Sequence, residues 1–231
     1  MKKLMTAHEV GLCYRLRKQI LKSSREIWAL KSLSFDLFEG EKLGIIGRNG
    51  TGKSTLMKLL AGIFSPSRGR ITWHRAVHVG LLSLGVGFEG SLTGRENAVL
   101  NGMLLGKSRK TMLKRVDAIK EYSELGDFFE YPVNTYSSGM LTRLGFAVAM
   151  ESDPDVLLLD EILGVGDASF QAKSEKTLRE KFKGEKTVVL ISHDGGQILH
   201  VATRVIWIEG GVVHMSGDPE EVIAKYNEAV K

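Results

Sequence analysis

The sequence has almost no cysteine and no long apolar run, and both absences limit where the chain can work. Cys13 is the single cysteine, so no internal disulfide can form, which is typical of a protein in a reducing compartment. No segment comes near the roughly 18 consecutive apolar residues that a membrane-spanning helix needs. The first residues include two lysines but lack the apolar core of a signal peptide. We therefore expect a cytoplasmic chain that does not cross a membrane by itself.

The chain also lacks a strong charge of either sign, internal repeats and low-complexity linkers. Its hydrophobic fraction of 43% and charged fraction of 26% are ordinary for a folded protein, which excludes a disordered or collagen-like chain. A net charge of +5 is too small to predict nucleic-acid binding, although it is compatible with contact to anionic lipid or polymer. The 231 residues are enough for one large domain or two modest ones.

Several segments have the periodicity of strands. Alternation of apolar and polar residues over 33–37 predicts a half-buried strand. Short apolar runs predict further strands: "KLGIIG", "VLLLD", "TVVLIS" and "RVIWIEGGVVHM". Gly210 and Gly211 divide the last of these into a hairpin. Asp218 and Pro219 then supply an N-cap and a first-turn proline for a closing helix.

The region between Leu92 and Met150 has helical spacing throughout. Thr93 and Glu96 form a capping box before one helix. A second helix is marked by an apolar face made of Leu113, Val116 and Ile119.

These patterns together predict one α/β domain over residues 1–231. Its core comprises residues 1–87 and 154–231. A helical subdomain is inserted at residues 88–153, and the chain then returns to finish the core.

The strongest local signal is "GRNGTGKST", which follows a predicted strand and opens a predicted helix. It fits the pattern G-x-x-x-x-G-K-[ST] of a phosphate-binding loop. Glycines let backbone N–H groups surround phosphate oxygens at a helix N-terminus. Lys53 would bring its charge to the β- and γ-phosphates, and Ser54 would offer a hydroxyl to Mg²⁺. The predicted nucleotide-binding residues are Gly47, Arg48, Asn49, Gly50, Thr51, Gly52, Lys53, Ser54 and Thr55.

Two apolar strands end in residues that suit phosphate chemistry. "DVLLLDE" ends in Asp160, which can hold Mg²⁺ through a water, and in Glu161, which can act as the general base for water attacking the γ-phosphate. "VVLISHD" places His193 at the tip of another strand, where it can sense the γ-phosphate. We expect the other histidines to be ordinary hydrogen-bonded surface groups.

The order of a phosphate-binding loop, a helical insertion, "YSSGM", "LLLDE" and a strand-tip histidine resembles the ATP-binding cassette (ABC) ATPases. "YSSGM" is similar to the signature loop of that family, Leu-Ser-Gly-Gly-Gln. The resemblance implies that Ser137, Ser138 and Gly139 contact the γ-phosphate of ATP held by a second copy in a head-to-tail homodimer. A serine hydroxyl and free N–H groups at the positive end of a helix suit that role. Asp167, in "VGDA", would lie at the same interface.

The family resemblance implies a P-loop NTPase (RecA-like) α/β core with an N-terminal antiparallel β-subdomain and an inserted α-helical subdomain. The phrases "LGVGFEGSLTGREN", "LNGMLLG" and "DEILGVGDASFQAKS" resemble the subgroup that exports O-antigen, capsule or teichoic acid polysaccharides. That subgroup implies an ATPase that binds ATP and Mg²⁺. Its implied partners are polytopic permease subunits at the cytoplasmic face of the inner membrane and, indirectly, a lipid-linked glycan. No nucleic-acid partner is expected.

The sequence departs from the family pattern in two places. "LLSLGVGF" lacks the glutamine that contacts Mg²⁺ and the attacking water in most ABC ATPases, and Ser83 is the nearest polar side chain. Ser138 replaces the first glycine of the signature loop, which adds bulk where the backbone meets phosphate. The aromatic side chain that stacks on adenine is predicted to be Tyr14, with Trp28 as a weaker alternative and ordinary packing of Tyr14 as another.

The stretch after Tyr14, "RLRKQILKSSREIW", is predicted to be an unusually long connection. It is basic, and such a run is usually a solvated face. An alternative hypothesis is that it approaches anionic headgroups or a phosphorylated lipid carrier.

Three other functions compete with polysaccharide export. An ABC ATPase of another transporter, for a drug or small molecule, would share all the motifs. A soluble ABC ATPase acting on ribosomes or DNA usually joins two cassettes or carries a long coiled coil, and 231 residues hold neither. An unrelated P-loop kinase is disfavoured by the signature-like loop and by His193.

Overall fold

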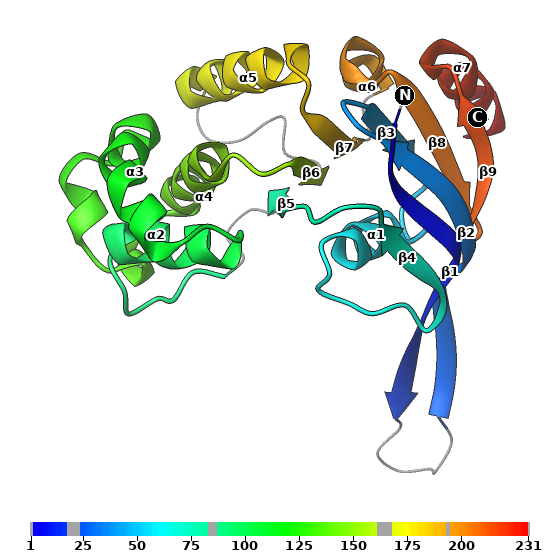
Figure 1. The fold of residues 1–231 in the computed structure, drawn as a ribbon, viewed down its shortest axis with the longest axis horizontal. Helices are drawn as coiled ribbons and strands as arrows, with labels where there is room; N and C mark the ends of the chain where they lie inside the picture. Colours follow the sequence, from blue (N-terminus) through cyan, green and yellow to red (C-terminus); the bar gives the residue numbers. More distant parts are fainter. Residues whose placement is uncertain (1, 18–23, 83–86, 161–167, 193–194, 231) are drawn as a thin grey trace. The chain divides into compact units, whose positions relative to one another are not determined.

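The computed structural model describes residues 2–17, 24–82, 87–160, 168–192 and 195–230 (Figure 1). The chain forms two compact units, one made of Met1–Ala76 with Glu185–Lys231 and the other of Val77–Gly184. The second unit therefore contains strands and a helix in addition to the predicted insertion at 88–153, whose boundaries stay a prediction.

The strands of the first unit follow the order β4-β1-β2-β9-β8-β3-β7 across the sheet. β3 is parallel to β7 and β8, whereas β1 pairs antiparallel with β2 and β4, and β8 pairs antiparallel with β9. The predicted α/β core with an antiparallel N-terminal β-subdomain is thus confirmed. The bounds are β1 Lys3–Arg17, β2 Ser24–Phe38, β3 Lys42–Ile46, β4 Arg68–Trp73, β7 Thr187–Ile191, β8 Arg204–Glu209 and β9 Val212–Gly217.

The central parallel strands of this sheet are buried on both faces. Every residue of β7 is buried, and in β3 only Lys42 is half-buried. Continuous apolar runs such as these suit parallel strands that are covered on both sides. The buried strand β3 therefore fixes the position of the loop that follows it.

The basic stretch after Tyr14 is mostly strand, so the prediction of a long connection there is wrong. β1 continues to Arg17 and β2 begins at Ser24, and the antiparallel register runs from Tyr14↔Ile27 to Arg17↔Ser24. This hairpin projects from the rest of its sheet (Figure 1). The strand was missed because Arg, Lys and Ser interrupt the β-branched and aromatic pattern that usually indicates one. The strands form here because their backbones pair with each other, although their side chains do not have a strand pattern.

The first unit contains three helices among its described residues: α1 Lys53–Leu60, α6 Gly195–Val201 and α7 Pro219–Val230. α1 ends before Gly62, whose φ of 73° lies in the left-handed region that glycine adopts without strain. The predicted N-cap of α7 is confirmed, because Asp218 Oδ1 accepts a hydrogen bond of 2.9 Å from the Glu220 N–H. The glycine hairpin between β8 and β9 is also confirmed, with positive φ at Gly210 and Gly211.

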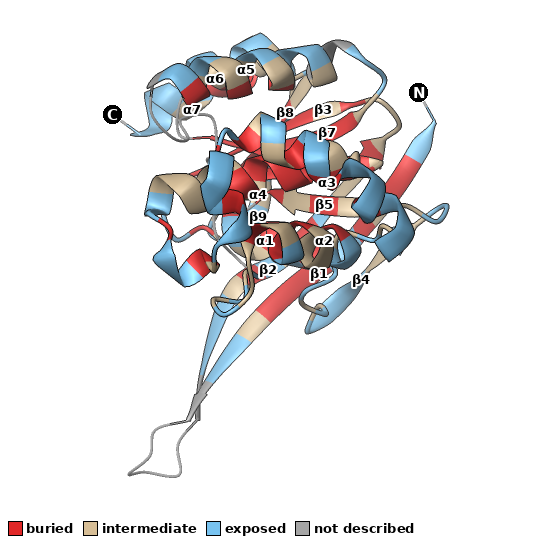
Figure 2. Cartoon of the chain, turned by 90° about the vertical axis from the view of Figure 1, so that its left-hand side faces the viewer, coloured by how far each residue is buried: buried red, intermediate tan, exposed pale blue. Residues whose placement is uncertain are grey.

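The second unit joins a small parallel sheet to a group of helices. Figure 2 shows that many of the buried residues of this unit lie on α4. They pack into an apolar cluster that includes Phe129, Leu144 and Val148. The bounds are β5 Val79–Leu82, β6 Val156–Asp160, α2 Gly94–Leu104, α3 Arg109–Ser123, α4 Ser138–Ser152, α5 Ala168–Lys183 and the short 3₁₀ helices η1 Gly126–Glu130 and η2 Val133–Thr135.

In this unit the predicted start of α2 is correct, whereas the predicted buried face of α3 is partly wrong. The predicted capping box of Thr93 and Glu96 opens α2. On α3, Val116 and Ile119 are buried as predicted, but Leu113 is 46% exposed and Met112 takes its place in the core. The error arises because Met112 lies four residues and Leu113 three residues before Val116, so both fit the i+3/i+4 spacing of a helix face. Among the described residues, no helix is both long enough and apolar enough to span a membrane.

Candidate functional site

The phosphate-loop sequence forms the turn between β3 and α1. Lys53 is the first residue of α1 and is only 6% exposed. Its Nζ atom donates hydrogen bonds to the carbonyl oxygens of Gly47 at 2.7 Å and Arg48 at 3.0 Å. The ammonium group is therefore held inside the loop, at the N-terminus of a helix, where an anion is favoured.

Two glycines of this loop are required by close backbone approaches. A Cβ atom at Gly47 would lie 2.3 Å from the carbonyl oxygen of Ile208. Gly52 has a φ of 95°, and a Cβ there would lie 2.5 Å from the carbonyl oxygen of Ala29. Gly50 also has positive φ, at 81°, but faces open space. The loop is thus tightly packed at Gly47 and Gly52 and unhindered at Gly50.

The hydroxyl residues of the loop have different partners. Thr51 Oγ1 donates to the Arg48 carbonyl at 2.9 Å and closes the turn. Ser54, the predicted Mg²⁺ ligand, is exposed on the first turn of α1, and Asn49 is exposed in the loop. Thr55 Oγ1 lies 3.4 Å from the hydroxyl of Tyr14.

Tyr14, the residue predicted to stack on adenine, therefore lies beside the phosphate-loop helix α1. The residue is 39% exposed, and its ring meets that of Phe64 edge-on, with 6.3 Å between the centroids. Trp28 pairs with Cys13, the neighbour of Tyr14. Successive residues of a strand point to opposite faces, so Trp28 lies on the other face of the hairpin from Tyr14. The geometry favours Tyr14 over Trp28, and it adds Phe64, which sequence reasoning did not single out.

Sequence reasoning also missed the groups behind the phosphate loop. A cavity of about 30 Å³ is lined by Gly47, by Ser192 at the end of β7, and by Tyr226 and Asn227 of α7. Ser192 Oγ donates to Gln197 Oε1 at 3.0 Å. The N-cap Asp218 and the first-turn proline Pro219 predicted the helix α7 but gave no sign that it packs against this loop.

Asp160 ends β6 in the second unit, as predicted from the apolar strand before it. Its Oδ1 atom is buried and has no hydrogen-bond partner within the described part of the chain. Buried carboxylate oxygens are normally paired or bound to metal. Glu161, Asp167 and His193, which were predicted to serve ATP chemistry, lie outside the described residues, as does Ser83.

The signature-like loop forms the N-terminus of α4. Ser137 is the N-cap, and its Oγ accepts a hydrogen bond of 3.2 Å from the Met140 N–H. Ser138 is exposed and Gly139 is half-buried, so both are open to a ligand. Further along α4, Leu144 and Val148 are buried in the apolar cluster of the second unit and hold the helix in place.

A hollow of about 340 Å³ adjoins this helix start. It is lined by both polar and apolar side chains, including those of Glu124, Phe128 and Arg143 as well as Ser137 and Gly139. The hollow was not predicted: its lining residues lie close together in the sequence, between 124 and 143, but no periodicity rule shows that the end of α3, η1 and α4 enclose one space.

The structure thus gathers the predicted nucleotide-binding residues into two groups. Lys53, Ser54, Thr55 and Tyr14 lie together in the first unit. Ser137, Ser138 and Gly139 lie together in the second unit, which also contains Asp160. A strand–glycine loop–helix turn with an inward lysine, set in a parallel sheet, defines a P-loop nucleotide-binding protein.

Known proteins narrow this class. A model of the ABC transporter family matches residues 30–164. The O-antigen export system ATP-binding protein RfbB of Klebsiella pneumoniae is 45% identical over 212 residues, which make up 92% of this chain and 85% of that protein. The teichoic acids export ATP-binding protein TagH of Lactococcus lactis is 40% identical over 91% of this chain, and the match covers 45% of that protein.

Solved structures agree on the fold. The dimeric structure of the ATP-binding cassette MJ0796 bound to ADP and Pi has a TM-score of 0.76 at 22% identity, covering 94% of this chain and 99% of that one. The cbiO1 structure from Clostridium perfringens has a TM-score of 0.67 at 23% identity, over 98% of this chain and 92% of that one. The chain belongs to the ABC transporter family. Within that family it is the ATP-binding ATPase domain.

Proposed function

We propose that the chain is the ATP-hydrolysing motor subunit of an ABC exporter that moves a lipid-linked polysaccharide across the cytoplasmic membrane. The observation that carries the proposal is the 45% identity to an O-antigen export system ATP-binding protein along 92% of the chain. Relatives named for teichoic acid export, at 38–40% identity, support the same class of cargo. Because the relatives name different polymers, the cargo is proposed as a class: O-antigen, capsule or teichoic acid.

The phosphates of ATP are proposed to bind within the loop Gly47–Thr55. Lys53 Nζ donates hydrogen bonds to two carbonyl oxygens of the loop. When ATP binds, phosphate oxygens would accept these hydrogen bonds instead. The loop N–H groups and the N-terminus of α1 favour the same anion. Tyr14 would stack on adenine, which its position 3.4 Å from Thr55 Oγ1 supports.

The donor atoms present fit a Mg²⁺ ion. Asp160 Oδ1 is buried and unpaired among the described residues, and carboxylate and hydroxyl oxygens are the ligands Mg²⁺ prefers. Ser54, in the first unit, separately offers an exposed hydroxyl of the kind that Mg²⁺ binds. When bound, Mg²⁺ would neutralise negative charge on the phosphates.

Hydrolysis is proposed to require two copies of the chain. Glu161 would accept a proton from the attacking water, and His193 would contact the γ-phosphate. Ser137, Ser138 and Gly139 of the other copy would cover that phosphate, which the exposed N-terminus of α4 supports. Asp167 would lie at the same interface.

The proposed assembly is a head-to-tail homodimer bound to polytopic permease subunits at the cytoplasmic face of the membrane. The export-system names of the relatives support a permease partner. ATP would close the dimer and hydrolysis would reopen it. The permease, rather than this chain, would contact the glycan.

Substitution Glu161→Gln tests the proposal. We expect hydrolysis to fall at least about a hundredfold, the typical contribution of a general base, with ATP binding kept. The tagged variant would be purified from gently solubilised membranes with ATP and Mg²⁺, and its partners identified by mass spectrometry. Glu180→Gln, on the exposed face of α5, is the matched control.

The partners decide between the candidate functions. A polytopic permease encoded beside glycan-synthesis enzymes would support polysaccharide export. A permease of another kind would assign a different transporter, and ribosomal or DNA-binding partners without a permease would contradict the exporter altogether.

A further inference from the structure

The loop that follows α1 begins with a fixed shape. Gly62, with a φ of 73°, donates its N–H to the Leu59 carbonyl at 3.1 Å. The Ile63 N–H donates to the Lys58 carbonyl at 2.9 Å, and this pair of bonds is a Schellman motif, which ends a helix in a defined direction. The Phe64 N–H donates to the same carbonyl at 3.2 Å. The backbone of Phe64 is therefore held at the C-terminal end of the phosphate-loop helix.

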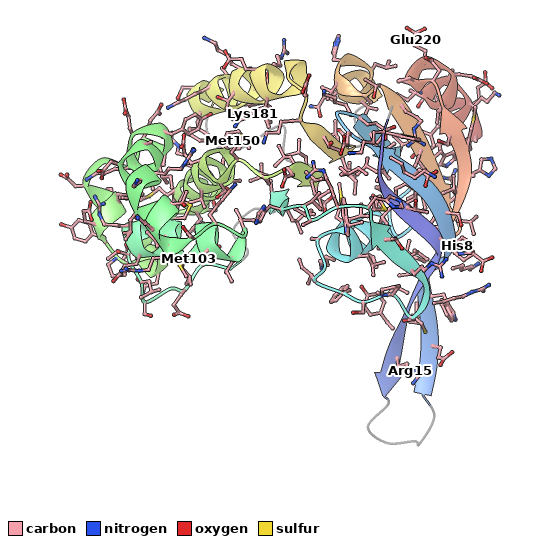
Figure 3. All side chains as sticks on the ribbon, in the orientation of Figure 1. His8, Arg15, Met103, Met150, Lys181 and Glu220 are labelled. Carbon is pink, nitrogen blue, oxygen red and sulfur yellow. The ribbon has the colours of Figure 1, made fainter. Side chains whose placement is uncertain are left out.

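The same loop is attached to β1 beside Tyr14. The Cys13 N–H donates to Ser67 Oγ at 3.1 Å, and the Ser67 N–H donates to the Gly11 carbonyl at 2.8 Å. Tyr14 is the next residue of β1, and it precedes Arg15, which Figure 3 labels on the projecting hairpin. The loop therefore connects the end of α1 to the strand that contains Tyr14.

The side chain of Tyr14 has contacts near both ends of α1. Its hydroxyl lies 3.4 Å from Thr55 Oγ1 on the first turn of the helix. Its ring meets the ring of Phe64, beyond the last turn, at an interplanar angle of 82°. An edge-on pair of this kind is a favourable aromatic contact, and it occupies at most one face of the tyrosine ring. Because Tyr14 is 39% exposed, the contact with Phe64 does not close the side chain off from a ligand.

These contacts restrict a side chain that a projecting hairpin would otherwise leave free to change its rotamer. A ligand that binds a freely rotating side chain must first fix it, and the lost conformational entropy weakens binding. A ring that is already held in one orientation binds a flat partner without that loss. Phe64, rather than the strand itself, supplies this restraint to the ring of Tyr14.

We propose that Phe64 is a positioning residue, which holds the ring of Tyr14 in the orientation that stacks on adenine. The inference rests on the proposed stacking of adenine on Tyr14, and it gives the loop after α1 a part in nucleotide affinity. Phe64 acts through Tyr14 and not through the phosphate loop. It should therefore strengthen binding of the base and leave binding of the phosphates unchanged.

The test compares the affinity of the full chain for ATP with its affinity for tripolyphosphate, which has the phosphates but no base. Both are measured by isothermal titration calorimetry with Mg²⁺ present. We expect Phe64→Ala to weaken ATP binding about threefold to tenfold, as the loss of an edge-on aromatic contact implies, and to leave tripolyphosphate binding unchanged. Phe64→Tyr keeps the ring and should retain the affinity. Ile63→Ala, at the neighbouring position that is 57% exposed, is the matched control.

A double-mutant cycle shows whether Phe64 acts through Tyr14. Tyr14→Ala removes the ring that Phe64 is proposed to hold, so a further change at Phe64 should then have no effect. We expect Tyr14→Ala/Phe64→Ala to bind ATP as tightly as Tyr14→Ala alone. A role of Phe64 in stability alone would instead weaken ATP binding in both backgrounds.

Three results would overturn the inference and leave the proposed function in place. They are an unchanged ATP affinity in Phe64→Ala when Tyr14→Ala weakens binding, an equal loss of ATP and tripolyphosphate binding in Phe64→Ala, and additive losses in the double variant. The first would mean that Tyr14 stacks without this support, the second that α1 is disturbed as a whole, and the third that the two rings act independently. An unchanged ATP affinity in Tyr14→Ala would contradict the proposed stacking itself, and the inference with it.

Discussion

The two glycine-marked turns of this protein both end at the N-terminus of a helix, yet they are built differently. The loop before α1 is filled from within, because Lys53 is buried and donates to two of its carbonyl oxygens. The loop before α4 contains no cation of its own and is closed by a serine cap, Ser137. Its next residue, Ser138, is exposed.

The difference matches the division of work proposed for them. A loop that carries its own cation and tightly packed glycines can hold phosphate by itself. A capped helix end with only a partial positive charge holds phosphate weakly and needs an anion that is positioned by another group. The first loop is therefore suited to bind nucleotide, and the second to complete a site made elsewhere.

The largest effect is expected from Lys53→Ala. The variant loses charge-assisted bonds to phosphate worth about 3 kcal/mol, so ATP affinity should fall about a hundredfold or more and hydrolysis should be lost. Titration with a fluorescent ATP analogue measures the affinity, and circular dichroism checks the fold. Lys58→Ala, exposed on the last turn of the same helix, is the control and should bind normally. Normal affinity in Lys53→Ala would remove the contrast between the two loops.

Ser137→Arg should separate binding from hydrolysis. A bulky cation at the start of α4 would block a partner's phosphate, so hydrolysis should be abolished while each monomer still binds ATP with unchanged affinity. Steady-state hydrolysis and equilibrium binding are measured on the same preparation. Ser137→Thr keeps a capping hydroxyl and should retain most activity. Retained hydrolysis in the arginine variant would mean that the turn is only a capped helix start.

Sequence reasoning succeeded where a local rule fixes the structure. The phosphate loop, the capping box of Thr93 and the cap of α7 at Asp218 each depend on a few neighbouring residues, and each predicted element is present. It also succeeded for buried strands such as β7, because a short apolar run has few alternatives in an α/β chain.

It failed where long-range pairing decides. The β1/β2 hairpin extends well past Tyr14 although its residues are poor strand formers, since each strand gains backbone hydrogen bonds from the other. The cavity of Gly47, Ser192 and Tyr226 brings together residues that are far apart in the chain, so no spacing rule could find it. Local signals therefore located the candidate ligand-binding loops, but not what supports them.

The smallest effect concerns the stability of the unit that carries the signature-like loop. Glu130 accepts two hydrogen bonds of 2.9 Å from Arg95 and one of 3.1 Å from Lys120, which ties η1 to α2 and α3. The hydrogen bonds from Arg95, followed by that from Lys120, lower the pKa of Glu130 from 4.5 to about 2. The carboxylate is 44% exposed, so solvent screening limits its net contribution to about 1 kcal/mol or less.

The sign of the pH dependence follows from that lowered pKa. The folded state holds Glu130 charged more strongly than the unfolded state does, so its contribution is complete above about pH 4.5 and is lost as the pH falls toward 2. Glu130→Gln should therefore reduce the urea midpoint of unfolding at pH 7, and the difference from the unaltered chain should shrink at pH 3.5. Glu121→Gln, exposed on α3, is the control. A difference that stays constant with pH would show that the glutamate contributes packing rather than charge. The signature-like loop would then be stabilised by packing and not by an exposed ion pair, as the phosphate loop is.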